Sequence, residues 1–172
     1  RSTNPTIDIN DEVRITEVTK SEEPFLNDED LANVDTRFIF KTIANTVTPS
    51  VVYIETIVPV ERDKNSDDFW DRVMPRRARS VGSGVIITKD GYILTNNHVI
   101  EHAVDHSIKV VLNDKREYPA KVVGLDPSTD LAVIKIEGEN HDAITVGNSE
   151  KIDVGEWVLA IGNPFRLKST VT

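Results

Sequence analysis

Short runs of apolar and β-branched residues, separated by turns and by no long helix, are the feature that most constrains the fold of this chain. The runs occupy residues 51–57, 84–88, 92–95, 108–112, 118–124, 131–136 and 156–161. Lys89-Asp90-Gly91 and Asp126-Pro127 supply the turn residues between some of these strands. Strands spaced in this way favour an antiparallel barrel or sandwich. We therefore predict an all-β fold.

The first 35 residues differ in composition from the rest of the chain. They hold ten acidic residues against three basic ones, which is −7 of the total charge of −9 and leaves −2 for the remainder. Few of their positions are apolar, so the segment cannot bury enough surface to offset its ordering entropy. We predict an acidic, flexible tail over 1–35. With no dominant basic face elsewhere, a nucleic-acid partner is not expected.

Two further segments flank the first predicted strand. Residues 37–46 carry apolar side chains at helical spacing, with Thr36 as the expected cap, and predict a short helix that docks on the body of the protein. Residues 60–80 form a long loop that contains Phe69 and Trp70. Loops of this length are functional or disordered, so an aromatic partner contact and a mobile loop both remain open.

The chain contains no cysteine, which excludes disulfides, a thiolate zinc site and a cysteine nucleophile. No apolar run has the length of a membrane-spanning helix. Residue 1 is Arg, so the sequence leaves open whether a targeting segment precedes it. No cofactor is expected.

His98 and Asp130 are the candidate catalytic residues. Each lies at the edge of an apolar run, His98 within Thr95-Asn96-Asn97-His98-Val99 and Asp130 directly before 131–136. A neutral imidazole can take a proton from a hydroxyl nucleophile when a buried carboxylate holds its tautomer. From the residues alone, ordinary structural roles for one His and one Asp remain the alternative.

The surrounding motifs narrow this choice, because they closely resemble those of the HtrA/Deg family of trypsin-like serine proteases. The similarity covers about 37–172 and rests on Gly82-Ser83-Gly84, Asp90 to Ile100, Val123-Gly124-Leu125-Asp126, Asp130 to Ile136 and Val154 to Phe165. The resemblance implies that His98 is the general base and Asp130 its partner. Asp126 is then a turn residue before Pro127.

The resemblance also implies an architecture and a biological setting. Residues 36–172 would form the N-terminal six-stranded β-barrel of a trypsin-like protease domain, followed in the parent protein by a second barrel and one or more PDZ domains. The parent would be a homo-oligomeric, ATP-independent endopeptidase of protein quality control that cuts unfolded proteins in the periplasm or cell envelope. In this family the loop corresponding to 60–80 can reach a neighbouring active site, which makes Phe69 and Trp70 regulatory candidates.

The family's Gly-Asn-Ser-Gly-Gly nucleophile motif does not occur in these 172 residues. Gly147-Asn148-Ser149 is followed by Glu150, so the glycines that let backbone N–H groups face an oxyanion are missing. We expect Ser149 to be a turn or cap residue and Ser83 to enter a strand. The chain alone is therefore predicted to be inactive. A further departure is Arg166, which replaces the usual glycine after Asn163-Pro164-Phe165.

A zinc peptidase and a non-catalytic binding module are the alternative functions. His98-Val99-Ile100-Glu101-His102 matches the His-x-x-Glu-His signature, and His106 extends the same helical spacing. The preceding β-hairpin, the return to strand after 104 and the lack of a third carboxylate ligand argue against zinc. We expect His102 and His106 to face solvent in a short helical turn.

Overall fold

The computed structural model describes residues 17–22, 35–59, 77–104, 107–163 and 170–171. The elements, in chain order, are α2 (Thr36–Val47), η1 (Thr48–Ser50), β1 (Val51–Pro59), β2 (Arg77–Ile86), β3 (Tyr92–Asn96), α4 (Asn97–Ile100), β4 (Lys109–Val111), β5 (Glu117–Asp126), β6 (Leu131–Ile136), η2 (Ser149–Lys151), β7 (Ile161–Gly162) and β8 (Thr170–Val171). None of the helices within these ranges is long and apolar enough to cross a membrane.

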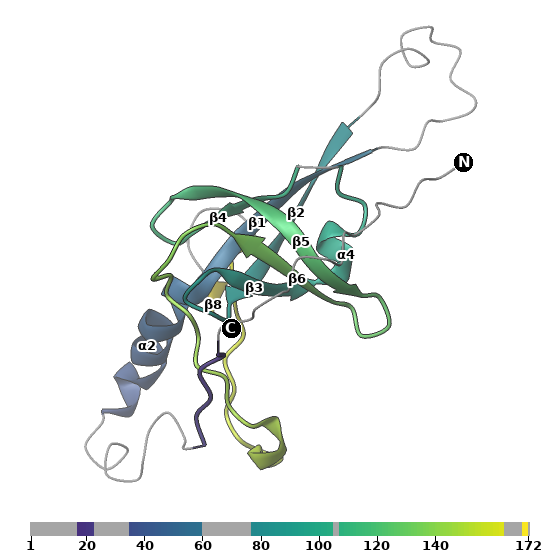
Figure 1. Ribbon diagram of the computed structural model, residues 1–172. Coiled ribbons are helices and arrows are strands. Elements are labelled where there is room, and N and C mark those ends of the chain that lie inside the picture. The colour runs from purple at the N-terminus through teal and green to yellow at the C-terminus, as the bar shows by residue number, and fades with distance from the viewer. Residues whose placement is uncertain (1–16, 23–34, 60–76, 105–106, 164–169, 172) are drawn as a thin grey trace, which may run out of the picture.

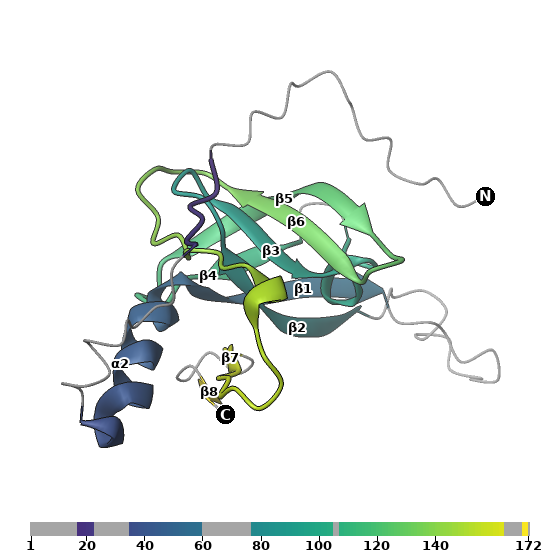
Figure 2. The ribbon, with the colours of Figure 1, turned by 90° about the horizontal axis from the view of Figure 1, so that it is seen from below.

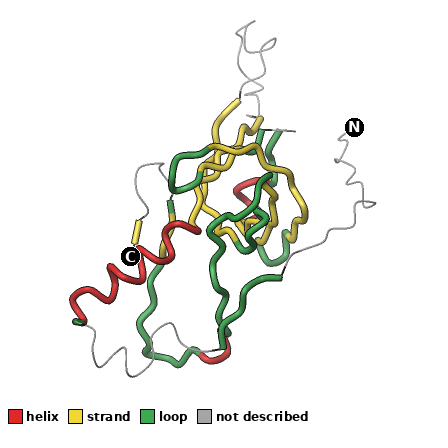
Figure 3. Tube along the Cα trace, turned by 60° about the vertical axis from the view of Figure 1, so that its left-hand side comes forward, coloured by secondary structure: helices red, strands yellow, loops and turns green. Residues whose placement is uncertain are grey.

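Six antiparallel strands close into a barrel. The order around it is β1-β2-β3-β6-β5-β4, and β4 pairs back to β1. Figure 3, which looks nearly along the barrel, shows the strands as a ring, and Figure 1 shows them from the side. Closure leaves the sheet without the long exposed edges of an open one. The predicted all-β barrel is confirmed.

The barrel interior is a continuous aliphatic core. Inward-facing residues alternate along the strands, as the two-residue period of a β-strand requires. The core residues with no measurable exposure are Val52, Ile54, Ile93, Val110, Ile134 and Ile136. The β2–β3 turn is shaped by Gly91, whose φ is +99° and whose position would bring a Cβ within 2.6 Å of the Ile136 carbonyl oxygen. The glycine predicted at this turn is therefore required twice over.

Two predicted boundaries are wrong. The loop expected over 60–80 is shorter, because β2 already begins at Arg77 and pairs there with Pro59 of β1; Phe69 and Trp70 lie outside the described residues. The strand expected over 156–161 is reduced to the two residues of β7, which pair with β8 outside the barrel. Because β1 to β6 already pair with one another in a closed ring, no barrel edge is left for a seventh strand.

The described part of the predicted tail is partly paired. Ser21 N–H donates to the Val146 carbonyl at 3.0 Å, and Val146 N–H donates to the Thr19 carbonyl at 2.9 Å, which makes a short parallel bridge. The Lys151 ammonium lies 2.8 Å from a Glu22 carboxylate oxygen. Because the segment around Val146 lies outside the barrel strands, its backbone groups are available to the tail. The backbone pairing concerns residues 19–21 only; residues 1–16 and 23–34 of the predicted tail lie outside the described residues.

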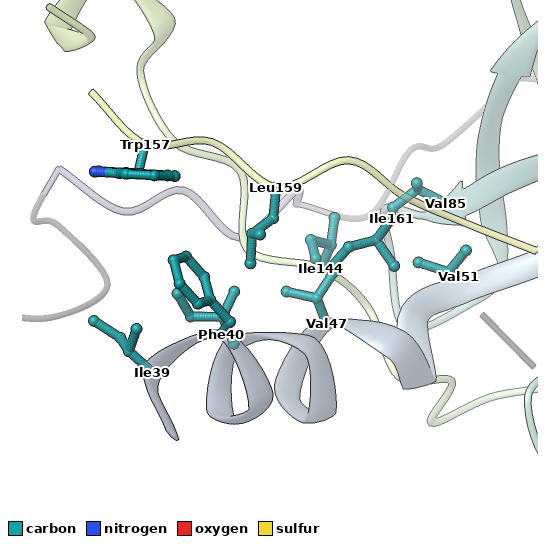
Figure 4. A pocket seen from close by; sticks show the side chains of 10 residues that line it. Ile39, Phe40, Val47, Val51, Val85, Ile144, Trp157, Leu159 and Ile161 are labelled. Carbon is teal, nitrogen blue, oxygen red and sulfur yellow. The ribbon is translucent and has the colours of Figure 1, made fainter. Parts of the chain in front are cut away.

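Helix α2 begins at Thr36, one residue before the predicted start, and projects from the barrel (Figure 2). Its apolar side faces an open groove that is lined by Ile39, Phe40, Val47, Val51, Val85, Ile144, Trp157, Leu159 and Ile161 (Figure 4). The rings of Phe40 and Trp157 lie 6.0 Å apart, and Trp157 is 88% exposed. Helix α2 therefore contacts the segment after the barrel through these two rings, and its apolar side shares an open groove with the barrel residues Val51 and Val85.

Candidate active site

Strand register brings His98 and Asp130 together. Asn96, the last residue of β3, pairs with Leu131, the first residue of β6. His98 follows β3 in the single turn of α4, and Asp130 directly precedes β6, so both leave the same end of two hydrogen-bonded strands. A separation of 32 residues in sequence thus becomes a direct contact.

Two hydrogen bonds join the pair. The backbone N–H of His98 donates to Oδ1 of Asp130 at 2.9 Å, and Nδ1 of the His98 ring lies 2.8 Å from Oδ2. A carboxylate accepts hydrogen bonds and donates none, so this contact places the ring proton on Nδ1. The other ring nitrogen, Nε2, is then an acceptor that can take a proton.

Asp130 is fixed from its backbone side as well. Its φ is +56°, in the left-handed region that aspartate tolerates better than most residues. Its carbonyl oxygen accepts from the backbone N–H of Asn97 at 3.0 Å and from Nδ2 of Asn96 at 3.2 Å. Nδ2 of Asn96 also lies 3.2 Å from Oδ2 of the Asp130 carboxylate. Sequence reasoning did not single out Asn96, although it belongs to the quoted motif.

The electrostatics favour an ionised carboxylate at this position. The pKa of Asp130 is lowered from its ordinary value, chiefly by the hydrogen bond from the His98 backbone N–H, and then by the His98 ring and the Asn96 amide. The neighbouring Asp126 has a lowered pKa for a local reason, since it accepts from the hydroxyls of Ser128 and Thr129. Asp126 therefore holds its turn, as predicted, with its carboxylate engaged by Ser128 and Thr129.

The pair lies on the surface, contrary to the expectation of a buried carboxylate. The side chains of His98 and Asp130 are 65% and 46% exposed. Both residues lie at the end of the barrel, beyond the last paired positions of β3 and β6, where the barrel core does not cover them. Nε2 of His98 is consequently accessible to a reacting group.

Close packing fixes α4 on the barrel. Val99 and Ile100 are buried, and the Val99 carbonyl accepts from the Thr56 hydroxyl at 3.3 Å. Gly82 of β2 allows this approach, because a Cβ at that position would lie 2.6 Å from a Val99 methyl carbon. The residues on either side of His98, Asn97 and Val99, are both buried, so the backbone of His98 is held in place.

The residues of the zinc alternative do not converge. Nδ1 of His98 is engaged by Asp130, and Nε2 of His102 lies 3.2 Å from Glu101. Helix α4 ends at Ile100, so His98 and His102 are not on one continuous helix. Across the part of the chain that the structure describes, no three His, Asp or Glu side chains form a metal-binding group; His106 lies outside it.

The surroundings of Ser149 and Ser83 indicate structural roles for both serines. Ser149 begins η2, where the Asn148 side chain accepts from the Glu150 N–H as a cap, and η2 lies below the barrel in Figure 1, away from α4. Ser83 was predicted to lie at the start of a strand, but it lies in the interior of β2, where it pairs with Tyr53. Its hydroxyl accepts from the Asn163 backbone N–H at 2.8 Å, which ties the segment after the barrel to β2.

Comparison with known proteins shows similarity along most of the chain. The family model described as "Trypsin-like peptidase domain" matches residues 82–172. A probable periplasmic serine endoprotease, DegP-like, from Chlamydia pneumoniae is 42% identical in an alignment of 158 residues that covers 77% of this chain and 32% of the relative. A protein of the same description from Marinomonas sp. is 57% identical over 106 residues, 60% of this chain and 22% of the relative.

Solved structures give the same picture. The HtrA-type protease AlgW with a decapeptide has a TM-score of 0.60 and 40% identity, covering 77% of this chain and 43% of its own. The same protease with a tripeptide has a TM-score of 0.62 and 41% identity, covering 77% and 38%. The chain thus spans a third or less of the length of these curated relatives.

Proposed function

Because this chain belongs to the trypsin-like peptidases, and within them to the HtrA/DegP-like serine proteases, we propose that it is the N-terminal lobe of an ATP-independent serine endopeptidase. We assign His98 as the general base and Asp130 as the carboxylate that orients it. The observation that carries the assignment is the 2.8 Å contact between Nδ1 of His98 and Oδ2 of Asp130. It leaves Nε2, on an exposed side chain, as the proton acceptor.

In the proposed reaction, Nε2 of His98 takes the proton of a serine hydroxyl as the oxygen attacks the peptide carbonyl. The imidazolium formed in this step is stabilised by the ionised Asp130, whose geometry keeps the ring oriented. Nε2 then gives the proton to the leaving amine. Water repeats the sequence to release the acyl group, and the base returns to its starting state.

We propose that the serine and the oxyanion donors come from outside these 172 residues and that this chain alone does not hydrolyse peptides. Support comes from the surroundings of Ser149 and Ser83 and from the relatives, of which this chain spans about a third. In this proposal 36–172 is the first lobe of the protease domain and 1–35 an acidic N-terminal extension. A second protease lobe and PDZ domains would complete a homo-oligomeric enzyme.

The proposed substrates are unfolded proteins or peptides, and the proposed location is the periplasm. The relatives are named periplasmic endoproteases, and the similar AlgW structures hold peptides. Such an enzyme would serve protein quality control. The segment 60–76, which contains Phe69 and Trp70, is the proposed contact to a neighbouring subunit.

The decisive experiment tests variants of this chain within the full-length protein, which would include the proposed serine-bearing lobe. His98→Ala and Asp130→Ala should each abolish cleavage of unfolded casein with an unchanged circular dichroism spectrum, and a serine-directed phosphonate should inactivate the wild type. Retained cleavage in His98→Ala would refute the proposed base. Activity lost to a chelator and restored by Zn²⁺ would favour the motif His98-x-x-Glu101-His102 instead.

The isolated 172-residue chain provides a second test. Removal of the nucleophile in a serine protease costs on the order of 10⁶ in kcat. Phosphonate-sensitive casein cleavage by the isolated chain would therefore contradict the proposed division between two lobes.

A further inference from the structure

Asn96 is a polar residue that touches the candidate pair without being either member of it. Its Nδ2 lies 3.2 Å from the carbonyl oxygen of Asp130 and 3.2 Å from the carboxylate oxygen Oδ2. Both partners are acceptors only, so the amide must present its NH₂ group and not its oxygen to them. One side chain therefore connects the backbone and the carboxylate of the same aspartate.

The contact of Asn96 with Asp130 matters because the backbone of Asp130 has an unusual conformation. A φ of +56° is an unfavourable backbone state for a residue with a Cβ, and it persists only when surrounding contacts hold it. The Asn97 N–H and the Asn96 amide are the two donors to the Asp130 carbonyl, and they flank it from the end of β3. The turn before β6 is thus held by the strand that leads to His98.

From this geometry we propose that Asn96 is a positioning residue of the proposed protease, which holds Asp130 in its left-handed conformation with Oδ2 directed at Nδ1 of His98. The inference rests on the proposed function, because it assigns Asn96 a part in orienting the general base. Oδ2 accepts from two directions, the ring and the amide, and Oδ1 accepts from the His98 backbone N–H. Rotation of the carboxylate away from the ring would break all three bonds.

The amide also contributes to the charge state of the aspartate. Its hydrogen bond is one of the causes that lower the pKa of Asp130, after the bonds from the His98 backbone and ring. Loss of the amide should therefore raise the pKa of Asp130 even if the carboxylate keeps its place. A residue that only filled space would have no such effect.

The test compares Asn96→Ala and Asn96→Asp with the matched control Asn113→Ala, which changes an exposed residue in the β4–β5 turn. In the full-length protease, Asn96→Ala should lower kcat about tenfold with little change in KM, as expected for one lost hydrogen bond to a charged group. Asn96→Asp keeps the size but removes both donors and adds a like charge, so its kcat should be at least as low. Asn113→Ala should match the wild type.

The readout that separates positioning from packing is the ¹³C titration of the Asp130 carboxyl in the 172-residue chain. Its midpoint should move to higher pH in Asn96→Ala and stay unchanged in Asn113→Ala. The inference is overturned if Asn96→Ala and Asn96→Asp leave kcat and this midpoint unchanged while His98→Ala and Asp130→Ala are inactive. If instead His98→Ala and Asp130→Ala retain activity, the proposed function fails, and the titration still measures the contact of Asn96 with Asp130.

Discussion

His98 contacts both oxygens of the Asp130 carboxylate: its backbone N–H donates to Oδ1 at 2.9 Å, and Nδ1 of its ring lies 2.8 Å from Oδ2. The backbone bond fixes which oxygen faces the ring. The contact thus defines the imidazole tautomer through main-chain geometry as well as through charge. This arrangement explains how a pair on the surface of the barrel stays oriented despite its exposure.

Replacement of Asp130 by Asn should disable the enzyme with little loss of structure. The backbone N–H of His98 needs an oxygen, so the Asn amide would turn its NH₂ towards the ring and force Nδ1 to accept. The proton then moves to Nε2, where it blocks base catalysis, and kcat should fall by about 10⁴ in the full-length protease. Casein cleavage and the thermal midpoint measure the two effects; an active Asp130→Asn would mean that the carboxylate does not set the tautomer.

Stability should depend on acid through the same carboxylate. The folded pKa of Asp130 lies below its ordinary value of 3.8, so its stabilising effect is complete above about pH 4 and is lost as the pH falls through the lower folded value. The difference in unfolding free energy between the wild type and Asp130→Asn should therefore be constant near neutral pH and shrink below pH 4. Urea unfolding at several pH values checks this, and a difference that grows in acid would contradict it.

The barrel could be predicted because its strands are local patterns. The runs at 51–57, 92–95 and 131–136 carry the β-branched residues and turn signals of strands, and the structure places β1, β3 and β6 there. The run at 156–161 has the same local pattern but is not a barrel strand, because a strand requires a partner edge and the ring has already closed. A local sequence pattern indicates that a segment can form a strand, but whether it joins the barrel depends on a free partner strand in the tertiary structure.

The sequence predicted His98 and Asp130 as candidate residues, but it did not predict the contacts that hold them in position. His98 and Asp130 stand in recognisable motifs, whereas the contact of Asn96 with Asp130 depends on the register of β3 against β6 and on a positive φ at Asp130. Neither the strand register nor the φ angle can be predicted from the local sequence pattern. The same holds for Ser83, whose hydroxyl meets a backbone group 80 residues away.

Ser83→Ala should loosen the segment that follows the barrel. Asn163 is 3% exposed, and its backbone N–H donates to the Ser83 hydroxyl at 2.8 Å, so the change leaves a buried donor without this acceptor. The expected cost is about 1–3 kcal/mol in the free energy of unfolding, together with faster hydrogen exchange at the Asn163 amide. Ser149→Ala, at an exposed position, is the matched control. Equal exchange at Asn163 in the two variants would show that the hydroxyl does not anchor this segment.

Gly82→Ala should displace the turn that carries His98. The added methyl group would lie 2.6 and 2.7 Å from the two Val99 methyl carbons, far inside van der Waals contact, so α4 must shift. Overpacking of this kind costs about 1–3 kcal/mol, and kcat should fall because a misplacement near 1 Å at a catalytic group costs about 10²-fold.

Two further variants make the steric cause of this effect testable. Gly124→Ala is the matched control, since a Cβ there meets nothing within 4 Å, and it should change the unfolding free energy by no more than about 0.5 kcal/mol. Val99→Ala removes both methyl carbons that the new Cβ would meet, so the double variant Gly82→Ala/Val99→Ala should recover part of the kcat lost in Gly82→Ala. Urea unfolding and casein cleavage measure the two effects. Additive losses in the double variant, with no recovery, would show that the contact between β2 and α4 does not position His98.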